Sequence, residues 1–203
     1  MRCVKEKGLS SSFEVGIPKR RYASPSGFVR FGLKINLAVA AVHNIFKNWH
    51  VTYHGTTFPN LKPIFDGGLV LLKPGDKKLG GKDLELATGH VSRCFLRHNL
   101  FTGKMETFDP NQVFTTPSSR YASHPAYARE HTVDNPLKSG QVSLRFIFEC
   151  RQRPGSYDIG QETVGARDIV LDPLFRNSEL EFYTKENSAI VITALLIQIS
   201  IRS

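Results

Sequence analysis

The stretch QVSLRFIFE, residues 141–149, alternates apolar side chains with polar or charged ones. Apolar residues occupy every second position, at Val142, Leu144, Phe146 and Phe148. A period of two is the pattern of a β-strand that places one face on a core. We therefore predict a strand here, and it is the anchor of the predicted fold.

Other segments with alternation or with continuous apolar character predict further strands. These are residues 28–37, 49–54, 113–115, 169–171, 180–183 and 189–201. Short helices are expected at residues 38–46 and 60–65, and over residues 118–131 with an interruption at Pro125. Strands dominate, so we predict an α+β domain built on antiparallel sheets.

Composition indicates a globular chain with a basic charge. The 203 residues are 40% hydrophobic and carry a formal net charge of +9, which allows one domain with a sizeable core. Such a charge attracts polyanions, including nucleic acid and phosphorylated cofactors. The three widely spaced cysteines are expected as reduced thiols, and no apolar run is long enough for a membrane span. We expect a cytoplasmic or nuclear protein without membrane contact.

Two segments are expected to lie outside the core. Residues 1–26 are rich in serine, proline and basic residues, and we expect a flexible basic leader before a domain that spans residues 27–203. Residues 73–112 are polar, contain five glycines and show little periodicity. A long segment of this kind predicts a partly ordered insertion over one face of the domain.

Three short segments combine aromatic and polar residues at the ends of predicted strands or at the start of a helix. They are YHGT at residues 53–56, FTTPSSRY at residues 114–121 and SELEFY at residues 178–183. Across residues 49–201, their order and spacing resemble the catalytic domain of the poly(ADP-ribose) polymerases, whose active site is a His, a Tyr and a Glu in that order. The resemblance implies an ADP-ribosyltransferase-like fold of two packed, mainly antiparallel sheets with short flanking helices.

The resemblance also implies a site that binds NAD⁺ and cleaves its nicotinamide–ribose bond. His54 would bond the adenine-side ribose, and Tyr121 would stack on the pyridinium ring. Gly55, through its backbone, and Ser118, through its hydroxyl, would hold the nicotinamide amide. Cleavage develops positive charge on the ribose, which a glutamate would stabilise. The implied NAD⁺-binding residues are His54, Gly55, Thr56, Phe114, Ser118 and Tyr121.

The catalytic carboxylate has two candidates. A glutamate followed four residues later by a tyrosine is typical of the polymerase-like pattern and selects Glu179, which precedes Tyr183. A Glu-x-Glu motif with the second glutamate catalytic is typical of the toxin-like branch and selects Glu181. The two glutamates are two residues apart in a predicted strand, so we expect their side chains to face the same side. We favour Glu179 and keep Glu181 as the alternative.

The implied function is that of an NAD-dependent ADP-ribosyltransferase, a glycosyltransferase that passes ADP-ribose to a protein or nucleic-acid acceptor. Two alternatives stay open. One is an inactive module of the same fold that binds ADP-ribose or nucleic acid, and the other is an NAD-dependent RNA 2′-phosphotransferase. The phosphotransferase branch relies on basic residues where Glu179 and Glu181 stand, which counts against it.

A metal site is not expected. His90, Cys94 and His98 are spaced four residues apart and would share one face of a helix. A fourth ligand is not evident, and Gly89 and Asn99 disfavour a long helix. NAD⁺ is therefore the one expected cofactor, and it is consumed as a substrate.

Overall fold

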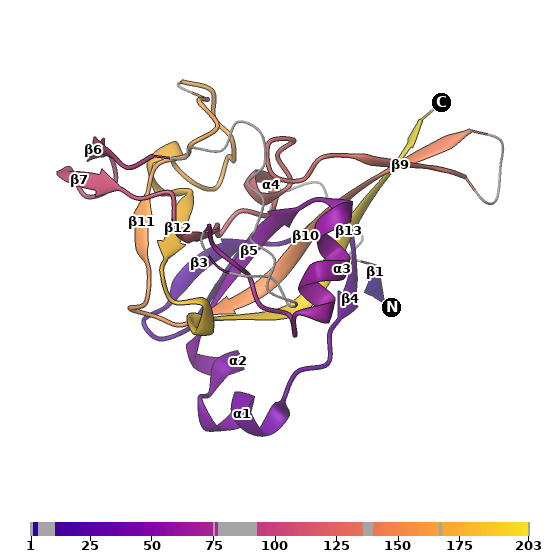
Figure 1. Ribbon diagram of the computed structural model, residues 1–203, viewed down its shortest axis with the longest axis horizontal. Coiled ribbons are helices and arrows are strands. Elements are labelled where there is room, and N and C mark those ends of the chain that lie inside the picture. The colour runs from indigo at the N-terminus through magenta and orange to yellow at the C-terminus, as the bar shows by residue number, and fades with distance from the viewer. Residues whose placement is uncertain are drawn as a thin grey trace.

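A six-stranded antiparallel sheet forms the centre of the computed structural model, with strands β10 and β13 running through its middle (Figure 1). Its strands follow the order β1-β4-β13-β10-β5, and β9 pairs with β10 on the same edge as β5. Their bounds are β1 (Arg2–Cys3), β4 (Phe28–Gly32), β5 (His50–Thr56), β9 (His131–Asp134), β10 (Gln141–Gln152) and β13 (Ile190–Arg202). The structure describes residues 2–3, 11–74, 76, 93–135, 140–166 and 168–202.

The two central strands confirm the strongest strand predictions. β10 pairs with β13 along its length, with a register shift between Glu149 and Cys150. In β13, Leu196 packs into a core cluster with Tyr53 of β5, whereas Ile192 packs into a second cluster with Leu71. A strand buried on both faces carries a nearly continuous apolar run instead of an alternation. This explains the sequence AIVITALLIQISI at residues 189–201.

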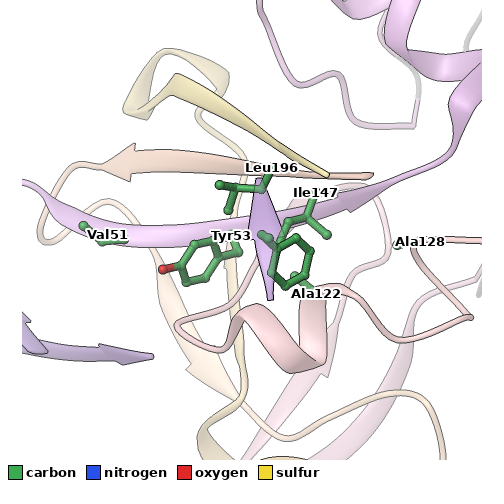
Figure 2. Packing of buried hydrophobic residues seen from close by; sticks show 7 residues of the cluster. Val51, Tyr53, Ala122, Ala128, Ile147 and Leu196 are labelled. Carbon is green, nitrogen blue, oxygen red and sulfur yellow. The ribbon is translucent and has the colours of Figure 1, made fainter. Parts of the chain in front are cut away.

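The first core cluster lies between the sheet and helix α4 (Ser119–Ala122), as Figure 2 shows. Tyr53 and Ile147 of the sheet and Ala122 of α4 belong to this cluster, and all three are labelled in the view. Its buried members are Phe28, Val51, Tyr53, Ala122, Ala128, Ile147 and Leu196. This cluster holds α4 against the sheet and thereby fixes one of the three motif segments.

A hairpin of β2 (Ser12–Val15) and β3 (Arg20–Ala23) packs beside this first cluster. The N–H of Ala23 donates to the carbonyl of Pro117 at 2.9 Å, and the hydroxyl of Tyr53 donates to the carbonyl of Ala23 at 2.7 Å. The expectation of a loosely ordered leader therefore does not hold for residues 12–23. The sequence signal of this hairpin is weak, because SFEV alternates over only four residues and RRYA does not alternate at all.

Helix α3 (Phe58–Asp66) covers the other face of the sheet (Figure 1). Its residues Leu61 and Ile64 pack against the second cluster, which includes Phe148 and Ile192. The single helix expected over residues 38–46 is instead two, α1 (Leu37–Val42) and α2 (Ile45–Asn48). Asn44 separates them because its φ of 48° is left-handed and cannot continue a right-handed helix.

A smaller antiparallel sheet of β11 (Asp158–Gly160), β12 (Glu181–Thr184) and β8 (Val113–Thr115) lies beside the large one (Figure 1). A β-bridge between Tyr53 and Thr116 joins the two sheets. The short helices η1 (Asn177–Glu179) and η2 (Asn187–Ala189) flank β12. The described residues thus confirm an α+β class with mainly antiparallel sheets and few short helices.

Other predicted elements also differ from the structure. Residues 169–171 form an irregular, bent segment and not a strand, and the predicted helix of residues 118–131 is confined to α4, since Pro125 cannot donate a helical hydrogen bond. The predicted insertion of residues 73–112 contains a hairpin of β6 (Phe95–Asn99) and β7 (Lys104–Phe108). Residues 75 and 77–92 of that insertion lie outside the described residues. Among the described segments, no helix is long and apolar enough to cross a membrane.

Candidate functional site

The three motif segments meet where the two sheets join. His54 lies in β5, Tyr121 lies in α4, and Glu181 is the first residue of β12. Tyr53 and Thr116 exchange both backbone hydrogen bonds, at 2.7 and 2.9 Å, which ties β5 to the chain just before α4. β12 pairs with β8 on the far side of the same junction. The segments that carry these residues are thereby joined at the junction.

Tyr121 and Glu181 contact each other directly. The hydroxyl of Tyr121 donates to Oε1 of Glu181 at 2.6 Å. Tyr121 is 3% exposed and Glu181 is 2% exposed. A buried carboxylate is costly unless it is hydrogen-bonded or paired, so this contact is part of what allows Glu181 to lie inside the protein.

Two further residues, which the sequence analysis did not single out, complete the surroundings of this carboxylate. Tyr127 donates its hydroxyl to Oε1 of Glu181 at 3.0 Å, and the hydroxyl of Thr163 does so at 2.6 Å. The other oxygen, Oε2, is buried and has no hydrogen-bond partner among the described residues. Tyr127 follows the Ser-x-x-Tyr motif by six residues, but no pattern in the sequence marks Thr163.

Burial raises the pKa of the Glu181 carboxyl above its ordinary value. Hydrogen bonds from the hydroxyls of Thr163, Tyr121 and Tyr127 act in the opposite direction, as does the positive charge of Arg97. Burial also raises the pKa of Tyr121, and the neighbouring negative charge of Glu181 adds to that effect. Desolvation is the leading cause for both groups, as expected of a polar pair enclosed by the core.

His54 is held by the second motif. Its Nδ1 lies 2.8 Å from the carbonyl oxygen of Phe114. A carbonyl can only accept, so Nδ1 carries the hydrogen and Nε2 of the neutral ring is an acceptor. Burial lowers the pKa of His54, opposed by the bond to Phe114, and this favours the neutral ring. Phe114 itself lies in β8, with its ring 5.7 Å from that of Phe108.

Gly55 allows a close approach between β5 and the segment that includes α4. A Cβ at this position would lie 2.2 Å from the carbonyl oxygen of Ala122 and 2.6 Å from Cβ of Tyr127. No side chain fits into that space, so the packing of these two segments by itself requires a glycine here. The next residue, Thr56, is buried and ends the strand, opposite Phe146 of β10.

Ser118 is the N-cap of α4. Its hydroxyl oxygen accepts the N–H of Tyr121 at 2.8 Å, as an N-cap residue does. The same hydroxyl donates to the buried carboxylate of Asp172 at 2.5 Å. Its hydrogen is therefore engaged within the protein, and Ser118 acts on the site by orienting Tyr121.

Glu179 lies apart from this group. It belongs to η1, where its carboxylate accepts the N–H of Arg176 at 3.2 Å and lies 3.8 Å from the guanidinium of Arg21. Its side chain is 27% exposed and lines a surface depression of about 340 Å³ together with Phe175. The expectation that Glu179 and Glu181 share a strand face is wrong, because β12 begins only at Glu181. The geometry brings Glu181, not the favoured Glu179, to Tyr121.

The described residues contain no group of three or more His, Cys, Asp or Glu side chains arranged to hold a metal ion. His98 lies in a β-strand, β6, and not in a helix, and Cys94 immediately precedes that strand. His90 lies outside the described residues. The four-residue spacing of these side chains therefore does not place Cys94 and His98 on one helix face.

No protein-family model matches the chain, and no solved structure matches it significantly. Function is therefore inferred from the hydrogen bonds, burial and charges at the junction of the two sheets. Tyr121, Tyr127 and Thr163 surround the carboxylate of Glu181, and His54 is held separately by the carbonyl of Phe114.

Proposed function

We propose that this chain is an NAD-dependent ADP-ribosyltransferase in which Glu181 is the catalytic carboxylate. One observation carries the proposal: a buried glutamate is hydrogen-bonded to Tyr121 through one oxygen, while its second oxygen accepts no hydrogen bond from the described residues. The aromatic residue, the acidic residue and His54 come from the three segments that resemble the polymerase motifs. The coarse fold, with two antiparallel sheets that meet at this point, is compatible with an ADP-ribosyltransferase-like architecture.

Glu181 has the chemistry that cleavage of NAD⁺ requires. When the nicotinamide–ribose bond breaks, its electron pair leaves with the nicotinamide and positive charge develops on the ribose. A carboxylate in a site of low dielectric stabilises that charge strongly. Its free oxygen, Oε2, can accept a hydrogen bond from a ribose hydroxyl and hold the sugar in place during this step.

His54 and Tyr121 suit the binding of the dinucleotide. Because Nδ1 of His54 donates to a carbonyl, Nε2 is left to accept a hydrogen bond from a ribose hydroxyl. An aromatic ring beside the pyridinium contributes an attraction of about 0.5–2 kcal/mol. These two residues therefore act mainly on the affinity for NAD⁺, whereas Glu181 acts mainly on the rate of bond cleavage.

Binding of NAD⁺ requires a local opening of this site. Tyr121 and Glu181 are almost wholly buried, and Tyr127 and Thr163 lie against the carboxylate. The dinucleotide therefore reaches Glu181 only after a local movement of the chain around the carboxylate. The same burial favours a second candidate function, an inactive module that binds ADP-ribose or nucleic acid through an outer surface and performs no chemistry.

Incubation of the full chain with NAD⁺ tests the proposal. Chromatography of released nicotinamide measures cleavage, and mass spectrometry of added candidate proteins and oligonucleotides detects transfer of ADP-ribose. We expect release by the wild type and its loss in Glu181→Gln, which keeps the size of the side chain and removes its charge. Binding of ADP-ribose without release of nicotinamide would establish the inactive module instead.

A further inference from the structure

Three hydroxyls converge on a single oxygen of Glu181. Those of Tyr121, Tyr127 and Thr163 lie 2.6, 3.0 and 2.6 Å from Oε1. The oxygens of a carboxylate together offer about four lone-pair sites, so three donors saturate Oε1. Oε2 is equally buried, takes no hydrogen bond from the described residues, and so keeps its acceptor capacity.

We propose that Tyr127 and Thr163 are positioning residues that fix Oε1 of Glu181 and reserve Oε2 for a hydroxyl of the donor's ribose. This inference rests on the proposed function, because it assigns the oxygen that meets the substrate. Neither residue belongs to the three motif segments. Each acts through Glu181 and not on the reacting bond.

Tyr127 and Thr163, which together we call the clamp on Oε1, lie in two separate segments of the chain. Tyr127 follows α4, and its Cβ is close to the space that Gly55 leaves open. Thr163 is exposed and lies between β11 and η1, where its backbone N–H also donates to the hydroxyl of Tyr121 at 3.0 Å. Since Thr163 is at the surface, its hydroxyl can be removed without disturbing the core.

The groups that face Glu181 determine how the carboxyl responds to such a change. They are the hydroxyls of Tyr121, Tyr127 and Thr163, and the charge of Arg97 in β6, all of which lower its pKa against the effect of burial. Removing a hydroxyl donor therefore raises the pKa of Glu181. The acid limb of the pH–rate profile therefore also moves to higher pH.

The experiment compares Tyr127→Phe, Thr163→Val and the double variant with the wild-type full chain. Carbon-13 NMR of labelled glutamates reports the carboxyl pKa, and the signal missing in Glu181→Gln identifies Glu181. We expect an upward shift in each variant, a larger shift in the double variant, and nicotinamide release slower by about 2- to 10-fold per lost hydrogen bond. Tyr22→Phe and Thr132→Val are matched controls elsewhere in the fold, with no shift expected.

The two readouts separate this inference from the proposed function. An unchanged pKa of Glu181 in both single variants overturns the clamp, whatever the activity. A shifted pKa without any nicotinamide release by the wild type supports the clamp and overturns the transferase. Release that requires Glu181 but does not respond to either hydroxyl, in rate or in pH profile, supports the transferase and overturns the positioning role.

Discussion

Glu179 and Glu181 are two residues apart and yet belong to different regions of the molecule. Glu181 lies under two tyrosines at the junction of the sheets and is 2% exposed. Glu179 faces outward from η1, and its carboxylate lies near the guanidinium of Arg21. The first carboxylate is enclosed by neutral hydroxyl donors, whereas the second is at the surface beside a positive charge.

This difference arises from where one strand begins. Residues two apart share a face only when both lie in a strand, and the boundary between η1 and β12 falls between the two glutamates. Leu180, which separates them, is wholly buried. The chain turns at this point, so neighbouring acidic residues acquire the separate roles of surface ion pair and buried site.

Substitution of the two glutamates gives the largest expected contrast. Glu181→Gln should lower nicotinamide release by about 10²-fold or more, because it removes the charge that stabilises the transition state. Glu179→Gln should change release by less than about 3-fold, since its carboxylate is outside the group around Tyr121. Initial rates at saturating NAD⁺ provide the measurement. A strong loss in Glu179→Gln with an active Glu181→Gln would reverse the assignment.

Asp172 lies between the surroundings of Glu181 and those of Glu179. Its replacement should have the next largest effect, on the free energy of unfolding. Its buried carboxylate accepts the hydroxyl of Ser118 on the side of the site, and it also lines the depression beside Glu179. Asp172→Ala leaves that donor unsatisfied, which costs about 1–3 kcal/mol. Unfolding in urea measures the loss. Asp158→Ala, at an exposed position, is the control; equal stability of the two variants would show that the contact with Ser118 contributes nothing.

The central sheet could be predicted from the sequence because its signals are local and long. The alternation of residues 141–149 and the apolar run of residues 189–201 became β10 and β13, the two central strands. The hairpin of β2 and β3 could not be predicted, because each strand has four residues and its stability depends on contacts with the core.

The short motifs predict candidate residues for the site but not their contacts. His54, Tyr121 and Glu181 were named from short motifs, but the choice between the glutamates depended on a strand boundary, which sequence patterns place least reliably. Thr163 carried no signal, since it reaches Glu181 from 18 residues away through a loop. Contacts of this kind depend on how loops pack in three dimensions.

The burial of Glu181 also predicts that the stability of the protein depends on pH. Burial raises the pKa of Glu181 above its ordinary 4.5, so the folded state holds a proton that the unfolded state has lost. Stability then falls as pH rises through this range. The free energy of unfolding of the wild type, minus that of Glu181→Gln, should therefore decrease as pH rises above 4.5, the ordinary pKa of the carboxyl.

Urea unfolding of both proteins at several pH values measures this difference. Burial lowers the pKa of His54 and of His50, which makes stability rise with pH as the unfolded histidines lose their protons. That contribution is common to both proteins and cancels in the subtraction. A difference that stays flat, or that increases with pH, would contradict the raised pKa of Glu181.

Loss of the surface ion pair between Arg21 and Glu179 should have the smallest effect on stability. Arg21 and Glu179 are 3.8 Å apart, with side chains 46% and 27% exposed, and surface ion pairs of this kind contribute about 0.2–1 kcal/mol. Arg21 also lies over the ring of Phe175, at 5.0 Å from its centre, so a single substitution would mix two contacts. A double-mutant cycle of Arg21→Gln and Glu179→Gln isolates the ion pair, because the contact with Phe175 is lost equally on both sides of the cycle. We expect a coupling below about 0.5 kcal/mol that decreases further with added salt. A coupling above about 1 kcal/mol that persists in salt would mean that Glu179 is held as firmly as Glu181, and the contrast between the two carboxylates would then lie in their chemistry and not in their surroundings.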